Sequence, residues 1–444
     1  MKSILTIIFI ILILAGCKIK KNDSFGFVEI KDGKFVQNGK PYIIIGTNYW
    51  YGSNLASKGK EGNRERLLRE LDYLKSMGIN NLRVQACSEG GDELQYSVKP
   101  ALQTKMGEYN EDLFDGLDFF LNELAKRKIT AVLVLNNYWQ WTGGMTKYLE
   151  WCGAGKIPYP SNDIPGSWQK FMQFSDLFYF NDSAKNTFKK TINVMLNRKN
   201  NYSGIQYKND PTIMAWQLAN EPRGGRDSSQ REALINWIHE TSAYIKTIDN
   251  NHLVTTGSEG SVGHHWSLDD YEKANNCSSI DYLTYHLWIQ NWSWFDPTKP
   301  DSTMPVAIKN AEKYINQHDS IAEKLNKPAV LEEFGVARDN GNFLPGTSSK
   351  FRNRFYEWVF NKTIKMLQSG AKTSGTDFWG WSGEGNAQHP GQFWQPGDDY
   401  VGDPPHEIQG WYAVYQSDTA TVAILRKYCS DMKAVESGAK QNQQ

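Results

Sequence analysis

Short apolar runs and segments with helical spacing alternate along almost the whole chain. Eight apolar runs of strand length end in polar or aromatic residues, at 42–46, 81–86, 131–136, 213–218, 253–256, 282–285, 329–331 and 376–379. Eight segments with helical spacing separate or follow them, at 64–77, 113–127, 184–197, 230–247, 268–275, 306–325, 350–369 and 421–430. In the first of these, leucines three and four residues apart form the apolar stripe of a helix that covers one side of a sheet.

This alternation predicts an α/β fold with a parallel sheet. Eight units fit a closed (β/α)8 TIM barrel better than an open doubly wound sheet, and no G-x-G-x-x-G motif follows the first strand. Ahead of the barrel, residues 27–39 read as an N-terminal β-hairpin with Asp32-Gly33 at its turn, which we expect to cap the barrel floor. The extra length follows strand ends, at 87–112, 137–183, 286–305 and 380–418, and such loops build the active sites of barrels.

The first residues are predicted to be a targeting segment. A short basic stretch at 1–3 precedes an apolar run at 4–14 that is too short to span a bilayer. The run ends in Leu14-Ala15-Gly16-Cys17, which resembles the lipobox of bacterial lipoproteins. The resemblance implies a signal peptide at 1–16, lipidation of Cys17, a tether at 17–25 and a single barrel domain at 26–444. We expect export and anchoring to a cell-envelope membrane, at the outer membrane or the periplasmic face.

Composition narrows the class of ligand. The 49 Lys and Arg residues balance 49 Asp and Glu residues, so charge gives no support for binding to nucleic acid or to an anionic membrane surface. Aromatic residues make up 13% of the chain, and 13 of the 16 tryptophans fall at or beyond the ends of predicted strands. This placement predicts an aromatic-lined cleft for an uncharged ligand.

The cysteines do not indicate a metal site. Cys87, Cys152, Cys277 and Cys429 allow three disulfide connectivities after export. Neither a CxxC motif nor a Cys/His ligand spacing is present, which argues against structural zinc.

Two carboxylates stand at the ends of the fourth and seventh predicted strands. The fourth runs Ile213-Met-Ala-Trp-Gln-Leu-Ala-Asn220-Glu221-Pro222, and the seventh runs Pro328-Ala-Val-Leu-Glu332-Glu333-Phe334-Gly335. These runs resemble the acid/base and nucleophile motifs of the retaining clan A barrel glycosidases, specifically of glycoside hydrolase family 5. The resemblance covers the chain from about residue 27 to the last helix. It implies Glu221 as acid/base and Glu333 as nucleophile, with carboxyl groups roughly 5 to 5.5 Å apart.

Adjacent residues of a strand point to opposite faces, so only one of Glu332 and Glu333 is expected to face the barrel mouth. Alternation does not choose between them. The family pattern places the nucleophile directly before the aromatic-Gly pair, which implies Glu333 and leaves Glu332 as a salt-bridged outer residue. Glu221 is expected to hold a proton near neutral pH, helped by a neighbouring negative charge and partial burial.

Further strand-end residues match the same family. The resemblance implies that Arg83 hydrogen-bonds the nucleophile, that Asn220 holds the sugar 2-hydroxyl, and that His286 lies near the acid/base. Trp379 matches the platform beneath the sugar, and Trp288 stands where an aromatic hydroxyl is common. Asn136-Asn137-Tyr138-Trp139, Glu259-Gly260 and the run from Trp379 through Trp381 to Glu384 resemble the β-mannanase branch, although loop salt bridges would explain Glu259 and Glu384 equally well. The candidate substrate-binding residues are Arg83, Asn137, Trp139, Asn220, Glu259, His286, Trp288, Trp379, Trp381 and Glu384.

The resemblance favours a retaining endo-β-1,4-mannanase that acts on mannan, glucomannan or galactomannan. An endo-β-1,4-glucanase or an exo-β-mannosidase is the alternative on this fold, and the mode of attack depends on whether loops 137–183 and 380–418 block one end of the cleft. A non-catalytic carbohydrate-binding barrel and a metal-dependent hydrolase are further alternatives. The last needs clustered metal ligands, whereas His286 is the only histidine expected at a strand end. We expect no cofactor, no metal, no nucleic-acid partner and a monomer.

Overall fold

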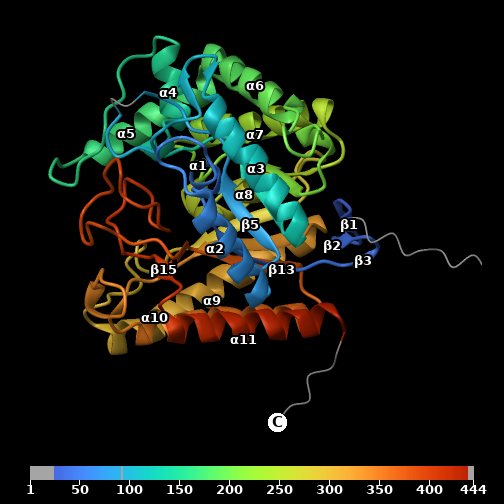
Figure 1. The fold of residues 1–444 in the computed structure, drawn as a ribbon, viewed down its shortest axis with the longest axis vertical. Coiled ribbons are helices and arrows are strands. Elements are labelled where there is room, and N and C mark those ends of the chain that lie inside the picture. The colour runs from blue at the N-terminus through green and yellow to red at the C-terminus, as the bar shows by residue number, and fades with distance from the viewer. Residues whose placement is uncertain (1–24, 92–93, 439–444) are drawn as a thin grey trace, which may run out of the picture.

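The computed structural model describes residues 25–91 and 94–438, and these form a closed barrel wrapped by helices (Figure 1). The eight barrel strands are β4 (Ile44–Asn48), β5 (Asn81–Gln85), β8 (Thr130–Val134), β9 (Ile213–Gln217), β10 (Leu253–Thr255), β11 (Leu283–Leu287), β12 (Ala329–Phe334) and β13 (Thr373–Phe378). All neighbours are parallel, β13 pairs with β4, and a bridge between Thr255 and Tyr282 closes the ring. The predicted (β/α)8 TIM barrel is confirmed, with each strand at a predicted place.

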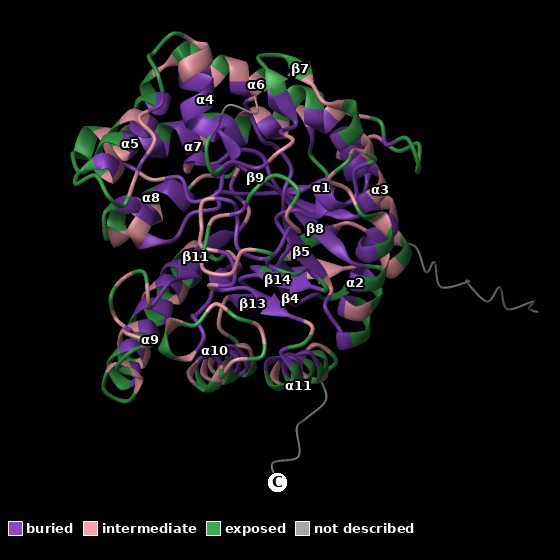
Figure 2. Cartoon of the chain, turned by 60° about the vertical axis from the view of Figure 1, so that its left-hand side comes forward, coloured by how far each residue is buried: buried purple, intermediate pink, exposed green. Residues whose placement is uncertain are grey.

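Helices form the outer layer. One helix of this layer follows each barrel strand: α2 (Arg64–Met77), α3 (Glu111–Arg127), α6 (Asp182–Asn197), α7 (Ser228–Ile248), α8 (Leu268–Asn275), α9 (Pro300–Leu325), α10 (Lys350–Ser369) and α11 (Thr419–Glu436). In α2, Leu67, Leu71 and Leu74 are buried as the stripe predicts, and Gly78 ends the helix in the left-handed region at φ 106°. Figure 2 shows the buried strands at the centre and the exposed faces of the helices outside.

The N-terminal hairpin closes the floor of the barrel. β1 (Val28–Lys31) pairs with β2 (Lys34–Gln37), which in turn pairs with β3 (Lys40–Pro41). At the turn, Asp32 and Gly33 both have positive φ, 55° and 71°, as a two-residue type I′ hairpin requires. Phe35 is buried, and its ring lies edge-on to Tyr282 of the barrel at 5.2 Å. The expected cap on the floor is therefore present.

The long loops after the strands gather at the opposite end. They contain α1 (Gly52–Leu55), α4 (Gly144–Trp151), α5 (Ser167–Asp176), β6 (Gln103–Lys105), β7 (Glu108–Tyr109), β14 (Trp381–Gly383) and β15 (Val414–Tyr415). The last loop is firmly held: the indole N–H of Trp50 donates to the carbonyls of Val401 and Gly402 at 3.0 and 3.1 Å. Asp403 accepts from the backbone N–H groups of Gly410 and Tyr412 at 2.8 and 2.7 Å. This loop, residues 380–418, is named here the fixed loop, and it forms one wall of the barrel mouth.

The proposed signal peptide and lipidation residue Cys17, and the tether up to residue 24, lie outside the described residues. Cys87, Cys152, Cys277 and Cys429 are free thiols. Within 25–91 and 94–438, none of the helices combines the length and apolar character needed to cross a membrane.

Candidate active site

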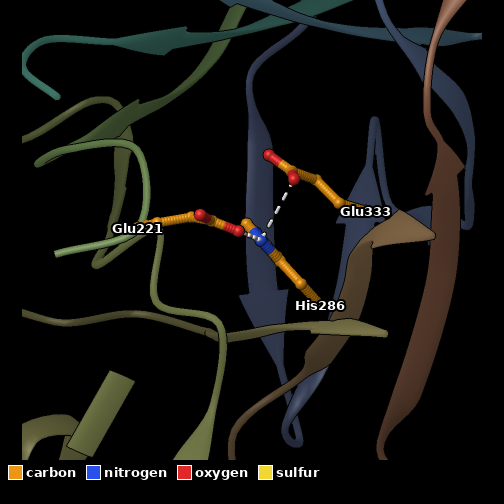
Figure 3. A group of neighbouring side chains, drawn as sticks. All are labelled: Glu221, His286 and Glu333. Atoms are coloured by element: carbon orange, nitrogen blue, oxygen red, sulfur yellow. Dashed lines mark hydrogen bonds and ion pairs between the residues drawn. The ribbon is translucent and has the colours of Figure 1, made fainter. Parts of the chain in front are cut away.

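Glu221, His286 and Glu333 meet at the barrel mouth, each at the end of a different strand (Figure 3). His286 Nδ1 lies 2.7 Å from Glu221 Oε1 and 3.2 Å from Glu333 Oε2. One oxygen of each carboxylate and the imidazole nitrogen lie within 4.8 Å of one another. This spacing suits a retaining glycosidase, in which the nucleophile and the acid/base stand roughly 5 to 5.5 Å apart, and is too short for the inverting arrangement.

Hydrogen-bond donors surround Glu333. Arg83 Nη1 donates to Glu333 Oε1, and the indole N–H of Trp288 donates to Oε2 at 3.2 Å. Arg83 is itself fixed by Asn48 Oδ1 at 2.9 Å and by Asn220 Oδ1 at 2.8 Å. Trp288 therefore supplies by its N–H the contact that an aromatic hydroxyl would make at this position. Together these donors fix the orientation of the Glu333 carboxylate.

Glu332 also points into the barrel, so the expectation that it is an outer residue is wrong. Gln217 Nε2 donates to Glu332 Oε2 at 2.6 Å, and Arg83 lies 3.6 Å from the same oxygen. The cause is a break in the register between β11 and β12, in which Tyr285 pairs with Leu331 and the next residue, His286, pairs with Glu333. A bulge of this kind interrupts the strict alternation of faces. Glu333 remains the glutamate that borders the acid/base.

Glu221 and His286 form a pair in which each residue shifts the pKa of the other. Burial lowers the pKa of His286, but Glu333 and Glu221 together raise it to about 10. Burial raises the pKa of Glu221, yet His286, Arg223 and the indole N–H of Trp139 lower it to about 2. Sequence reasoning expected a raised pKa at Glu221; the directions of the two shifts instead favour the proton on His286, whose Nδ1 lies 2.7 Å from Glu221 Oε1. The pair as a unit holds one proton through neutral pH.

A cavity of about 420 Å³, named here the main cavity, opens above the carboxylates. Seven of the 16 tryptophans line it: Trp139, Trp141, Trp168, Trp266, Trp288, Trp292 and Trp379. The fixed loop adds Pro404, His406 and Glu407, and the His406 ring stacks parallel to Trp141 at 5.9 Å. Flat apolar faces with a few polar groups are the lining expected for a sugar. The main cavity is therefore the aromatic-lined cleft that the sequence predicts.

Five predicted binding residues line the main cavity, and two lie beneath it on the carboxylates. The five are Trp139, Asn220, Glu259, Trp288 and Trp379, and the two are Arg83 and His286. Glu259 is also held in an ion pair with Arg223 at 2.6 Å, and burial raises its pKa to about 7.

Three predicted binding residues lie elsewhere. Asn137 is fully buried, and its Oδ1 accepts from the backbone N–H of Trp139 and from Asn220 Nδ2, so it orients binding residues. Trp381 is fully buried against Tyr73, because β13 ends at Phe378 and the chain turns before β14. Glu384 pairs with Arg69 of α2 at 2.8 Å and borders a different depression. The turn after β13 thus places Trp381 and Glu384 outside the site.

Sequence reasoning missed several wall residues. Arg223 stands two residues after Glu221 and stacks over Trp139 at 4.7 Å, a position that strand-end reasoning can find. Glu407 has no such signal, because nothing in a long loop tells which side chain turns inward. One of its carboxyl oxygens is buried without a hydrogen-bond partner among the described residues. Burial and the nearby carboxylates Asp403, Glu333 and Glu221 hold its pKa well above the usual value.

A family model described as "GH family 5 beta-mannosidase-like" matches residues 25–437. The chain belongs to glycoside hydrolase family 5. It is therefore a glycoside hydrolase, and the family membership explains why carboxylates recur at the ends of its fourth and seventh barrel strands.

Relatives from this family include plant and fungal enzymes. Mannan endo-1,4-beta-mannosidase 5 of Arabidopsis thaliana is 32% identical over 371 residues, which are 80% of this chain and 79% of that protein. The crystal structure of the family 5 mannosidase from Rhizomucor miehei has a TM-score of 0.85 and 38% identity, covering 93% of this chain and 99% of that one. The endo-1,4-beta-mannanase of Rhizomucor miehei, at 23% identity and a TM-score of 0.67 over 92% of this chain and 99% of that one, shows the shared fold.

Proposed function

We propose that this family 5 hydrolase cleaves β-1,4-linked mannan chains with retention of configuration, with Glu221 as general acid/base and Glu333 as nucleophile. The observation that supports the proposal most strongly is the short spacing of the two carboxylates, whose oxygens lie within 4.8 Å on either side of His286. The names of the plant and fungal relatives support mannose-containing substrates. Mannan, glucomannan and galactomannan are the substrates to test first.

In the first step, a Glu333 oxygen attacks the anomeric carbon while the bond to the leaving oxygen breaks. His286 first passes its proton to Glu221 across their 2.7 Å contact, and Glu221 donates it to the leaving oxygen, which leaves Glu221 ionised for the second step. Arg83 and Trp288 orient the Glu333 carboxylate before attack. They also stabilise the charge that returns to Glu333 when it later departs.

In the second step, Glu221 removes a proton from water, whose oxygen attacks the same carbon as the bond to Glu333 breaks. Two inversions give net retention. Asn220, whose amide bridges Arg83 and Asn137, presents its remaining N–H to the main cavity, where we propose that it binds the sugar 2-hydroxyl.

Exo attack is a second candidate mode, and the fixed loop favours it over the endo attack predicted from sequence. Trp50 follows β4, three strands round the barrel from β9, after which Glu221 stands, and it anchors the loop through the carbonyls of Val401 and Gly402. From the same loop, Pro404, His406 and Glu407 line the main cavity. A wall at the glycone end leaves room for a chain terminus.

Incubation with mannan, cellulose and xylan, followed by sizing of early products and NMR of the first anomer formed, tests the proposal. Hydrolysis of mannan with initial release of the β-anomer supports it. Mannose as the main early product indicates exo attack, and a ladder of oligosaccharides indicates endo attack. Cellobiose from cellulose without mannan cleavage, or initial release of the α-anomer, would contradict the proposal.

We also propose that the protein is exported and anchored through lipidated Cys17. The support is the lipobox-like sequence Leu14-Ala15-Gly16-Cys17. Radiolabelled palmitate should be incorporated into the wild-type chain and not into Cys17→Ser, which should leave the membrane fraction. Equal membrane association of both forms would contradict the anchor.

A further inference from the structure

Glu332 is buried beneath the nucleophile and takes no part in the proposed mechanism. Its side chain is 1% exposed, and it does not belong to the lining of the main cavity, so it is not placed to touch a sugar bound there. Burying a carboxyl costs free energy unless polar groups meet it. The contacts of Glu332 therefore indicate what it does inside the barrel.

The amide of Gln217 connects Glu332 to Arg83. Gln217 Nε2 donates to Glu332 Oε2 at 2.6 Å, and Gln217 Oε1 accepts from Arg83 Nε at 2.8 Å. A guanidinium has only donors, so the amide oxygen has to face Arg83, and the amide N–H then needs an acceptor on its other side. Glu332 Oε2 is that acceptor. Without it, an N–H of the fully buried Gln217 would lose its partner in this orientation, at a cost in free energy.

All three nitrogens of the Arg83 guanidinium take part in holding it on the nucleophile. They donate to Glu333 Oε1, Asn48 Oδ1, Asn220 Oδ1 and Gln217 Oε1. Because the guanidinium is planar and rigid, its orientation at Glu333 depends on the contacts made by its other N–H groups. The contact at Nε is the one that Glu332 controls, through the amide of Gln217.

A second buried carboxyl, that of Asp377, lies at the same level of the barrel but has no such link. One residue earlier on the two neighbouring strands, Leu331 pairs with Thr376. Neither oxygen of Asp377 has a hydrogen-bond partner in the part of the chain that the structure describes. Burial, and after it the charge of Glu332, raises the pKa of Asp377 well above its usual value, which favours the uncharged acid. Asp377 therefore does not compete for the guanidinium.

We infer that Glu332 is a positioning residue for the nucleophile. By accepting from Gln217, it fixes the amide that holds Arg83 in place. This inference rests on the proposed function, because it takes Glu333 as the nucleophile. Since Glu332 acts through Gln217 and not on the sugar, its loss should slow the chemical steps and leave the binding of the substrate almost unchanged.

Glu332→Met and Glu332→Gln separate the hydrogen bond from the volume of the side chain. Both keep the length of glutamate, but only glutamine keeps an oxygen that accepts well from Gln217. With β-1,4-mannotetraose, kcat should fall about tenfold or more in Glu332→Met, KM should change by less than about threefold, and Glu332→Gln should restore most of the loss. Asp377→Asn is the matched control, because it alters a buried carboxyl at the same level, and it should keep kcat within about twofold.

A double-mutant cycle separates this link from a general disturbance of the barrel. Gln217→Met removes the amide, so adding Glu332→Met should lower kcat no further than Gln217→Met does alone, to within about threefold. Two independent effects would multiply instead. Multiplied losses, equal losses in Glu332→Met and Glu332→Gln, or a kcat of Glu332→Met within about twofold of wild type would overturn the inference. Failure of the unaltered protein to cleave mannotetraose would overturn the proposed function itself, and this inference with it.

Discussion

Three donors from two barrel strands meet the oxygens of Glu333: Arg83 from β5, and His286 and Trp288 from the end of β11. Only His286 also contacts the acid/base, so it is the residue through which the charge states of Glu221 and Glu333 are linked. Despite their burial, the carboxylates Glu333 and Glu221 raise the pKa of His286 to about 10, and His286 is the main group that lowers the pKa of Glu221 to about 2. The proton is therefore retained to higher pH than an isolated carboxyl would allow.

Replacement of His286 by Asn tests this link. Wild-type activity should be lost at alkaline pH, when the pair of Glu221 and His286 releases its proton. In His286→Asn, only the carboxyl of Glu221 can hold that proton. The alkaline limb of kcat/KM should therefore move to lower pH in the variant, and kcat should fall by about 10²-fold or more. Trp139→Phe, which removes a neutral donor to Glu221, should not move the limb downward. An unchanged limb in His286→Asn would contradict the shared proton.

At the scale of elements, the periodicity of apolar residues was sufficient to predict the barrel and the hairpin on its floor. The strands, α2, α8 and α10, and the turn at Asp32-Gly33 follow from apolar spacing and local turn chemistry, which act over a few residues. The bulge beside Glu332 and the turn after Phe378 depend on contacts between distant strands, so neither alternation nor the family resemblance revealed that Glu332 faces the barrel interior or that Trp381 lies outside the site. The position of Glu407 in the cavity wall could not be predicted from the sequence for the same reason, because it depends on how a long loop packs.

In the proposed exo mode of attack, the fixed loop limits the length of the product. Replacing residues 404–407 by glycines removes Pro404, His406 and Glu407 from the wall of the main cavity. Early products from mannan should then shift from mannose toward oligosaccharides, as chromatography of the digest will show. The same replacement at 395–398, in the same loop but outside the lining, is the control. An unchanged product profile in the first variant would mean that this loop does not close the glycone end.

At the scale of the whole molecule, stability is linked to pH through buried carboxyls. Burial raises the pKa of Glu89 to about 8, even though it accepts from the Tyr148 hydroxyl at 2.9 Å and from the Gly144 N–H at 3.1 Å. A carboxyl with a higher pKa in the folded state binds its proton more tightly there. Its contribution to stability is full below the unfolded pKa, near 4.5, and is lost as the pH rises through about 8.

Glu89→Gln should remove this dependence, because glutamine resembles the protonated acid and does not ionise. Melting temperatures of the two forms should be similar near pH 4.5, and the variant should melt higher by about 2 °C or more at pH 8.5. Differential scanning calorimetry from pH 4.5 to 8.5 measures the difference. A constant gap between the two forms across this range would show that Glu89 is ionised throughout.

The central claim is that Glu333 forms a covalent bond to a mannosyl unit. Incubation with 2-deoxy-2-fluoro-β-mannosyl fluoride, which slows the second step more than the first, followed by peptide mass mapping, tests it directly. The account predicts time-dependent inactivation with a single label on Glu333, and no label in Glu333→Gln. Attachment to Glu332 or Glu407, or hydrolysis of mannosides with no trapped intermediate, would contradict it.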